Sequence, residues 1–129
     1  VNHRFPSSER LKQKSLIDAL FKGANRAFHH PVMAIWKPLE LPFNAPIQVG
    51  FSVPKKHYKH SVKRNLIKRR LREAYRLQND GLHATLAKQN GQIAVLFVMM
   101  KTDNISYEEL QKKMMLLLRD IAAKIEHTK

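Results

Sequence analysis

The sequence predicts an α+β fold, a single-domain sandwich with a mostly antiparallel sheet and three helices. The apolar residues of segment 47–53 alternate with small or polar ones, as in a strand with one buried face. The apolar residues of segments 60–78 and 106–125 recur every three or four positions, as in amphipathic helices. With 43% hydrophobic residues, the 129-residue chain (1–129) is expected to form one domain with its own core.

The N-terminal half is predicted to hold one helix and three strands. Ser7 or Ser8 can cap a helix that runs to about Lys22, where Gly23 ends it. The elements expected next are an edge strand at 24–28, a strand at 32–36, a proline-bounded loop at 39–46 and the alternating strand at 47–53.

The C-terminal half is predicted to begin with a basic helix over residues 60–78. Residues 79–91 leave two alternatives open, an extension of this helix or a separate turn around 82–88. Residues 93–99 are apolar on both faces, as in a central strand. If this strand and the strand at 47–53 are parallel neighbours, the basic helix is the crossover between them, and such crossovers are usually right-handed.

The last helix has the clearest start signal. Ser106 and Glu109 form a capping box, and Ile105 with Leu110 forms a hydrophobic staple. Apolar residues then continue at helical spacing to Ile125.

The composition is strongly basic, with 24 Lys and Arg against 10 Asp and Glu and a formal net charge of +14. Such a charge destabilises a compact chain by self-repulsion, so a polyanionic partner is expected. A membrane surface is the alternative to nucleic acid, but the basic segment lacks the broad apolar face that insertion requires. The absence of cysteine, of a long apolar run and of a signal-peptide pattern predicts a cytoplasmic protein without disulfides.

Ten Lys or Arg residues lie in segment 55–76, where Glu73 is the only acid. On a helical wheel at about 100° per residue, one sector of roughly 140° holds Arg64, Asn65, Lys68, Arg69, Arg72 and Arg76, which we call the cationic strip. Ile67, Leu71 and Ala74 fall on another face, suited to docking on a core. Cations held in a row on a rigid helix suit a row of phosphates. An ordinary solvated face is the alternative, but it does not explain the near-absence of acids.

The sequence contains no recognisable catalytic or metal site. His57 and His60 are three residues apart, but the lysines and arginines around them repel a metal ion. The four aspartates lie in different segments, and neither HExxH nor a phosphate-binding glycine motif is present. We therefore predict no catalytic residue and no metal held by the protein.

Four aromatic side chains are candidates for stacking on unpaired bases, namely Phe21, Phe28, Trp36 and Tyr58. Phe21 and Trp36 also fit core positions, and that alternative stays open, whereas Tyr58 lies in a polar loop and is expected to be exposed. Apart from Asn65, the strip is all Lys and Arg. This composition favours recognition of backbone and shape, which suits RNA better than duplex DNA.

Adjoining segments read Gly50-Phe51-Ser52-Val53-Pro54-Lys55-Lys56, Val62-Lys63-Arg64-Asn65, Lys68-Arg69 and Arg72-Glu73. This pattern closely resembles the signature of the bacterial ribonuclease P protein subunit, and Arg10-Leu11, Leu20-Phe21-Lys22 and Tyr107-Glu108 extend the resemblance over nearly the full chain. Three positions depart from the family pattern. Leu66 stands in place of an arginine, Pro54 in place of a serine, and Ile17 in place of the first phenylalanine of a Phe-x-x-x-Phe pair.

The resemblance implies a protein cofactor of a catalytic RNA that removes the 5′ leader from precursor tRNA, with magnesium-dependent chemistry carried by the RNA. The implied partners are ribonuclease P RNA and precursor tRNA, with the protein as a monomer in a 1:1 ribonucleoprotein and no membrane contact. The family also has a left-handed β-α-β crossover, against the usual rule. A ribosomal or other structural RNA-binding protein without a role in cleavage is the alternative function.

Two groups of site residues follow from the pattern and the resemblance together. The predicted RNA-binding residues are Lys55, Lys56, Lys59, Lys63, Arg64, Asn65, Lys68, Arg69, Arg72 and Arg76. The predicted leader cleft is formed by Ile17, Phe21, Trp36 and Tyr58, with Lys55 and Lys56 beside it.

Overall fold

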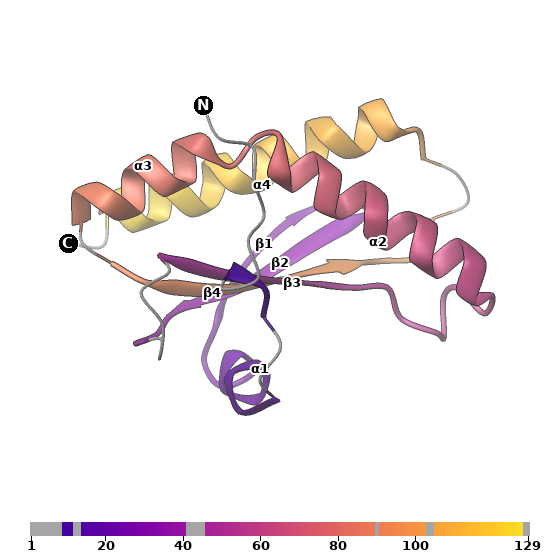
Figure 1. The fold of residues 1–129 in the computed structure, drawn as a ribbon, viewed down its shortest axis with the longest axis horizontal. Coiled ribbons are helices and arrows are strands. Elements are labelled where there is room, and N and C mark those ends of the chain that lie inside the picture. Colours follow the sequence, from indigo (N-terminus) through magenta and orange to yellow (C-terminus); the bar gives the residue numbers. More distant parts are fainter. Residues whose placement is uncertain (1–8, 12–13, 41–45, 90, 103–104, 128–129) are drawn as a thin grey trace.

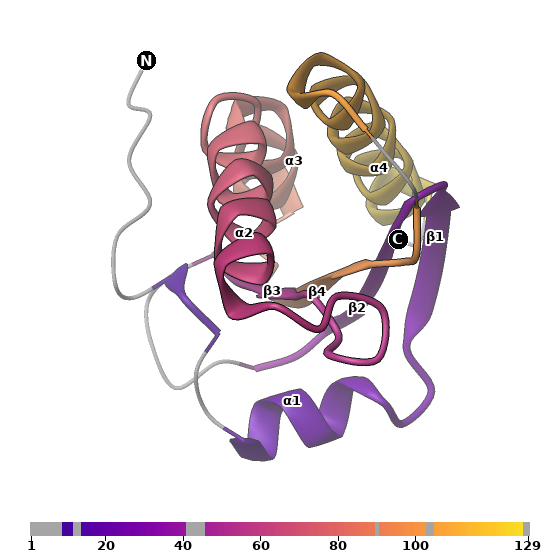
Figure 2. The ribbon, with the colours of Figure 1, turned by 90° about the vertical axis from the view of Figure 1, so that its right-hand side faces the viewer.

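The computed structural model describes residues 9–11, 14–40, 46–89, 91–102 and 105–127. In chain order the elements are α1 (Lys14–Leu20), β1 (Asn25–His29), β2 (Val32–Pro38), β3 (Ile47–Ser52), α2 (Ser61–Arg76), α3 (Asp80–Gln89), β4 (Ile93–Met99) and α4 (Tyr107–His127). Helices α2, α3 and α4 cover one face of the sheet, and α1 lies against the other (Figure 1, Figure 2). The predicted α+β class is confirmed.

The sheet has the strand order β1-β2-β4-β3. The β1–β2 and β2–β4 pairings are antiparallel, whereas β3 and β4 are parallel, so the sheet is mostly antiparallel as predicted. A parallel pair cannot be joined by a tight hairpin, and the chain between β3 and β4 instead runs through α2 and α3. This connection places the basic helix on one face of the sheet.

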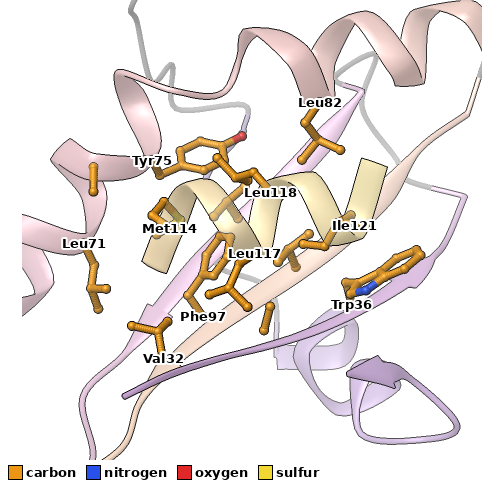
Figure 3. Packing of buried hydrophobic residues seen from close by; sticks show 14 of the residues in the cluster. Val32, Trp36, Leu71, Tyr75, Leu82, Phe97, Met114, Leu117, Leu118 and Ile121 are labelled. Atoms are coloured by element: carbon orange, nitrogen blue, oxygen red, sulfur yellow. The ribbon is translucent and has the colours of Figure 1, made fainter. Parts of the chain in front are cut away.

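The main core lies between the sheet and the three helices above it. The Phe97 ring on β4 stacks on Phe51 of β3 with centroids 5.8 Å apart, and it lies 6.0 Å from the Tyr75 ring of α2. Figure 3 shows Phe97 and Tyr75 close to Met114 and Leu117 of α4. Truncating a buried aromatic side chain to alanine costs about 3–5 kcal/mol, so this cluster fixes α2 and α4 on the sheet.

The second half of the chain matches the predicted elements, with one addition. The Ser106 hydroxyl accepts a hydrogen bond from the Glu109 backbone N–H at 3.2 Å, as the capping box predicts. In the segment 79–91, α3 forms a helix of its own and does not extend α2. This helix is longer than the turn predicted around 82–88. The described residues therefore form four helices, where the sequence predicted three.

The first helix begins later than the sequence predicts. The expected cap at Ser7 or Ser8 lies outside the described residues, and Arg10 pairs with Val49 along the edge of β3. The Leu11 N–H donates to the Val49 carbonyl at 2.9 Å. This non-local pairing outweighs the local helix signal, as tertiary context commonly does.

Residues 9–11, which we call the strap, contact the layers on both sides of the sheet. Leu11 packs in the cluster beneath α1, and the Glu9 carboxylate lies 3.6 Å from His83 Nε2 of α3. A Cβ added at Gly50 would lie 3.1 Å from Leu96 Cδ1 and 3.4 Å from Leu11 Cβ. The glycine of the signature therefore leaves room for the strap to cross β3.

Glu9 is a buried carboxylate, and within the described part of the chain the basic group that lies within 4 Å of it is His83. Burial raises the pKa of Glu9, and burial lowers the pKa of His83, the basic group that faces it. The His83 imidazole is therefore mostly neutral at pH 7, and the Glu9 charge remains costly there.

Replacing Glu9 by glutamine should raise the melting temperature at pH 7 by a few degrees, because the amide carries no charge to desolvate. A carboxyl group whose pKa is raised on folding stabilises the fold when protonated, so the wild type gains relative stability as pH falls. The difference in melting temperature between the wild type and Glu9→Gln should therefore become smaller as the pH is lowered from 7 to 4. Glu40→Gln, at an exposed glutamate, is the control. A lower melting temperature for Glu9→Gln at pH 7 would show that the carboxylate stabilises the strap.

Candidate RNA interface

Helix α2 points its cationic strip outward because its apolar face is fixed in the core. Ile67, Leu71, Ala74 and Tyr75 are all buried, at the helical spacing that the sequence predicts. Gln78, just after the helix, donates hydrogen bonds to the Ala74 and Gln111 carbonyls and so ties α2 to α4. The rotation of α2 about its axis is therefore determined by packing.

Four residues of the strip are directed toward solvent. Asn65, Arg69 and Arg72 are exposed, and Lys68 is half-buried, as expected for long side chains that leave a helix near its packed edge. The wheel-based placement of these residues is confirmed.

Arg64 and Arg76 are engaged within the protein. Arg64 Nη1 donates to the carbonyl oxygens of Tyr58 at 3.0 Å and Lys59 at 2.8 Å. Arg76 Nε donates to Glu73 Oε2 at 3.1 Å, and this contact lowers the pKa of Glu73. Arg64 thus fixes the loop before α2, and the charge of Arg76 is offset by a carboxylate one turn away.

The loop of residues 53–60 carries three more exposed cations, Lys55, Lys56 and Lys59. The backbone N–H groups of His57 and Tyr58 both donate to the Pro54 carbonyl at 3.1 Å. Together with Arg64, these bonds give the loop a defined shape. The three lysines therefore extend the cationic surface from the start of α2 toward the end of β3.

Tyr58 is buried, and the prediction that it is exposed is wrong. Its side chain is 5% exposed, and its hydroxyl donates to the Met100 carbonyl at 2.9 Å. Burial raises the pKa of Tyr58, and the Lys63 ammonium lies 5.7 Å from the ring centroid. Tyr58 anchors the loop to the end of β4, so its ring is not available for stacking on a base.

The predicted leader-cleft residues do not come together in the structure. Trp36 is 3% exposed and belongs to the main core on the helix side of the sheet, so its core interpretation is confirmed and its assignment to the cleft is wrong. Ile17 is half-buried against the opposite face, and Phe21, just after α1, is 54% exposed. Of the four predicted leader-cleft residues, only Ile17 and Phe21 lie on the side of the sheet that α1 covers.

A row of partly exposed side chains crosses the α1 side of the sheet. The strand register pairs Phe28 with Met33, Met33 with Val98, and Val98 with Ser52, so these four residues lie side by side across all four strands. Phe28 is 54% exposed, and the other three are half-exposed. At about 4.8 Å between strands, this open row spans about 14 Å.

Of the four residues of the open row, only Phe28 was predicted from the sequence as a candidate for stacking on a base. The alternation of apolar and small residues in segment 47–53 indicates two faces for that strand, but the row depends on the register of three strand pairings. Ser52 ends β3 directly before the loop of residues 53–60, so the open row adjoins the lysines of that loop.

Neither a metal-binding cluster nor a membrane-spanning helix occurs in the described ranges of the chain. Within these ranges, no three His, Asp or Glu side chains gather as a metal site would require. No helix in the described part of the chain is long and apolar enough to cross a membrane.

The comparisons with known proteins agree with this geometry. A family model described as Ribonuclease P matches residues 5–122. The chain belongs to the ribonuclease P protein family. The earlier resemblance is confirmed, and membership places the chain among RNA-binding protein components of a ribonucleoprotein that acts in tRNA processing.

Individual relatives support the same assignment. The ribonuclease P protein component of Chlorobium phaeobacteroides is 31% identical over 124 residues, covering 88% of this chain and 84% of the relative. That of Chlorobaculum tepidum is 36% identical over 89 residues, which cover 67% of this chain and 58% of the relative. The structure of the Staphylococcus aureus RNase P protein matches with a TM-score of 0.70, 16% identity and coverage of 88% and 94% of the two chains, a likeness of fold.

Arg64 and Arg69 should differ in their effect on stability. Arg64→Ala removes two hydrogen bonds to the carbonyls of the loop of residues 53–60, and we expect a loss of about 1 kcal/mol in the free energy of unfolding. Arg69→Ala removes the same charge from an exposed position and should change this free energy by less than about 0.5 kcal/mol. Urea denaturation at pH 7 measures both values. Equal midpoints would contradict a structural role for Arg64.

Proposed function

We propose that this chain is the protein cofactor of a ribonuclease P RNA and binds both that catalytic RNA and the single-stranded 5′ leader of precursor tRNA. The observation that carries the proposal is a rigid cationic helix and loop adjoining an open row of side chains on the sheet. The RNA supplies the magnesium-dependent cleavage chemistry, and the protein supplies binding. The complex is a cytoplasmic 1:1 ribonucleoprotein.

The cationic strip and the loop lysines are proposed to contact the phosphates of the catalytic RNA. The strip residues Asn65, Arg69 and Arg72 are exposed on a helix whose rotation is fixed by packing, which supports this assignment. Cations that are already positioned lose little further conformational entropy on binding. Because Arg64 and Arg76 are engaged within the protein, they act mainly by holding the loop and the helix end.

The leader is proposed to lie along the open row, with Phe21 and Phe28 as the stacking residues. Phe28 is the one aromatic residue in the row, and both phenylalanines are about half-exposed. Stacking on an aromatic face tolerates any base, which suits leaders of differing sequence. Lys55 and Lys56, in the loop that follows β3, supply cations for the leader phosphates. Trp36 and Tyr58 are buried, so in this proposal they support the fold and do not contact the leader.

The protein should stimulate leader release by a ribonuclease P RNA at low magnesium. Purified protein, ribonuclease P RNA and precursor tRNA are mixed at a magnesium concentration where the RNA alone is slow, and release of the 5′ leader is measured. The affinity for the RNA should also fall steeply with salt. If about six phosphates are neutralised, the logarithm of the affinity should fall by about 4 for each tenfold rise in salt concentration. Protein alone is the control and should release no leader. Salt-dependent binding without stimulation would instead support a structural RNA-binding protein.

Phe28→Ala should weaken binding of leader-bearing precursor and leave binding of mature tRNA unchanged. Loss of one stacked base is expected to reduce the affinity of the holoenzyme for precursor by about tenfold, since such stacking is worth about 1–3 kcal/mol. Val62→Ala is the control, because Val62 is an exposed apolar residue on α2 away from the row. Equal losses for precursor and mature tRNA would count against leader binding at this face.

A further inference from the structure

Helix α2 carries a second pair of cations on the flank opposite Lys68 and Arg72. Lys63 and Arg70 are both exposed and stand seven residues apart, two turns along the same side of the helix. On a wheel at about 100° per residue, Arg70 points roughly 160° away from Arg72 and from Lys68. Arg70 is therefore a cation of α2 outside the cationic strip.

Lys63 and Arg70 line one small pocket. The pocket has a volume of about 70 Å³ and is bounded by Tyr58, Lys63, Leu66, Ile67, Arg70, Met99, Thr102 and Ile105. Its walls thus come from α2, from the end of β4 and from the chain that leads into α4. Figure 1 shows the first turns of α2 and the end of β4 toward the same end of the molecule.

The floor of the pocket is apolar and fixed, and its rim is cationic. The Tyr58 ring is held by the hydrogen bond from its hydroxyl to the Met100 carbonyl, and the Lys63 ammonium lies 5.7 Å from the ring centroid. Among the described residues that bound the pocket, none is an Asp or Glu. Thr102 adds a hydroxyl group that can donate a hydrogen bond.

This combination suits a phosphodiester group with its sugar. Two cations and a hydroxyl match the charge and acceptor oxygens of a phosphate, and the apolar floor matches the carbon face of a ribose. A volume of about 70 Å³ holds only a few water-sized groups, so a phosphate with part of its sugar can enter but a whole nucleotide cannot. Leu66, which stands where the family has an arginine, supplies part of this apolar lining.

We propose that α2 lies between two segments of RNA chain, one on the cationic strip and a second with a phosphate at the pocket of Lys63 and Arg70. The helix with its side chains is about 10–12 Å across, so one backbone strand cannot follow both flanks at once. The proposal rests on the proposed function only in taking RNA as the partner. It assigns to Lys63 and Arg70 a different RNA segment from that bound by Arg69 and Arg72.

The two segments can be mapped because the chain contains no cysteine, so a single introduced cysteine is the only attachment point. A short photo-cross-linker is attached at Leu66→Cys, which lines the pocket and keeps both cations, and at Arg72→Cys on the strip. Each variant is bound to ribonuclease P RNA, irradiated, and the linked nucleotides are identified by primer extension. Lys88→Cys on α3 is the control for random linkage.

The expected result is two separate sets of linked nucleotides, one for each variant. The proposal is overturned if Leu66→Cys links the same nucleotides as Arg72→Cys, or links none above the Lys88→Cys background. This readout does not depend on leader release, so it stands apart from the test of the proposed function.

A binding measurement tests the two cations directly. Lys63→Ala/Arg70→Ala should reduce RNA affinity about tenfold more than Lys88→Ala/Arg119→Ala, which removes one lysine and one arginine from exposed positions on α3 and α4. For Lys63→Ala/Arg70→Ala, the slope of log affinity against log salt concentration should decrease in magnitude by about 1, as for one lost phosphate contact. Melting temperatures of both double variants check that folding is unchanged. Equal affinities and slopes for the two double variants would overturn the proposal.

Discussion

The packing of four side chains of α2 against the core holds the whole cationic surface in place. Ile67, Leu71, Ala74 and Tyr75 are buried between the sheet and α4, whereas the rest of the helix carries most of the positive charge of its region. A formal charge of +14 favours expansion of the chain, and burial of apolar area must offset that repulsion. The same contacts that stabilise the fold therefore set the direction in which the cations point.

The loop before α2 shows how the protein uses some of its charge internally. Arg64 belongs to the strip by its position on the wheel, yet its guanidinium bonds to two carbonyls of the loop. Tyr58 holds the same loop from the other side through the Met100 carbonyl. Because of these anchors, Lys55, Lys56 and Lys59 extend from a defined backbone, and binding of a polyanion requires little ordering of the loop.

Local sequence patterns correctly predicted the strands and helices whose formation depends mainly on neighbouring residues. The alternation in 47–53, the apolar run in 93–99 and the capping box at Ser106 each correspond to an element in the structure. The orientation of α2 also followed from the sequence, since helical periodicity alone separates its buried and exposed faces.

The errors lie where distant parts of the chain meet. Arg10 lies near residues with helix-capping chemistry, but it pairs with Val49 at the open edge of β3, a contact that no local window contains. Tyr58 sits among polar residues, and its burial depends on residues distant in the sequence, such as Met100, whose carbonyl lies 42 residues later and accepts its hydroxyl hydrogen bond. The open row likewise required the register of all four strands, because Phe28, Met33, Val98 and Ser52 come from four separate segments.

The unequal covering of the two sheet faces links the fold to binding. Three helices bury one face, whereas the short helix α1 leaves the row from Phe28 to Ser52 partly exposed on the other (Figure 2). The strap joins both layers, since Leu11 packs beneath α1 and Glu9 faces His83 of α3. Gly50 permits this crossing by leaving no side chain between Leu11 and Leu96. The glycine and the lysines of one signature segment thus serve different ends: Gly50 makes room for the strap that borders the sheet face, and Lys55 and Lys56 supply the charge beside it.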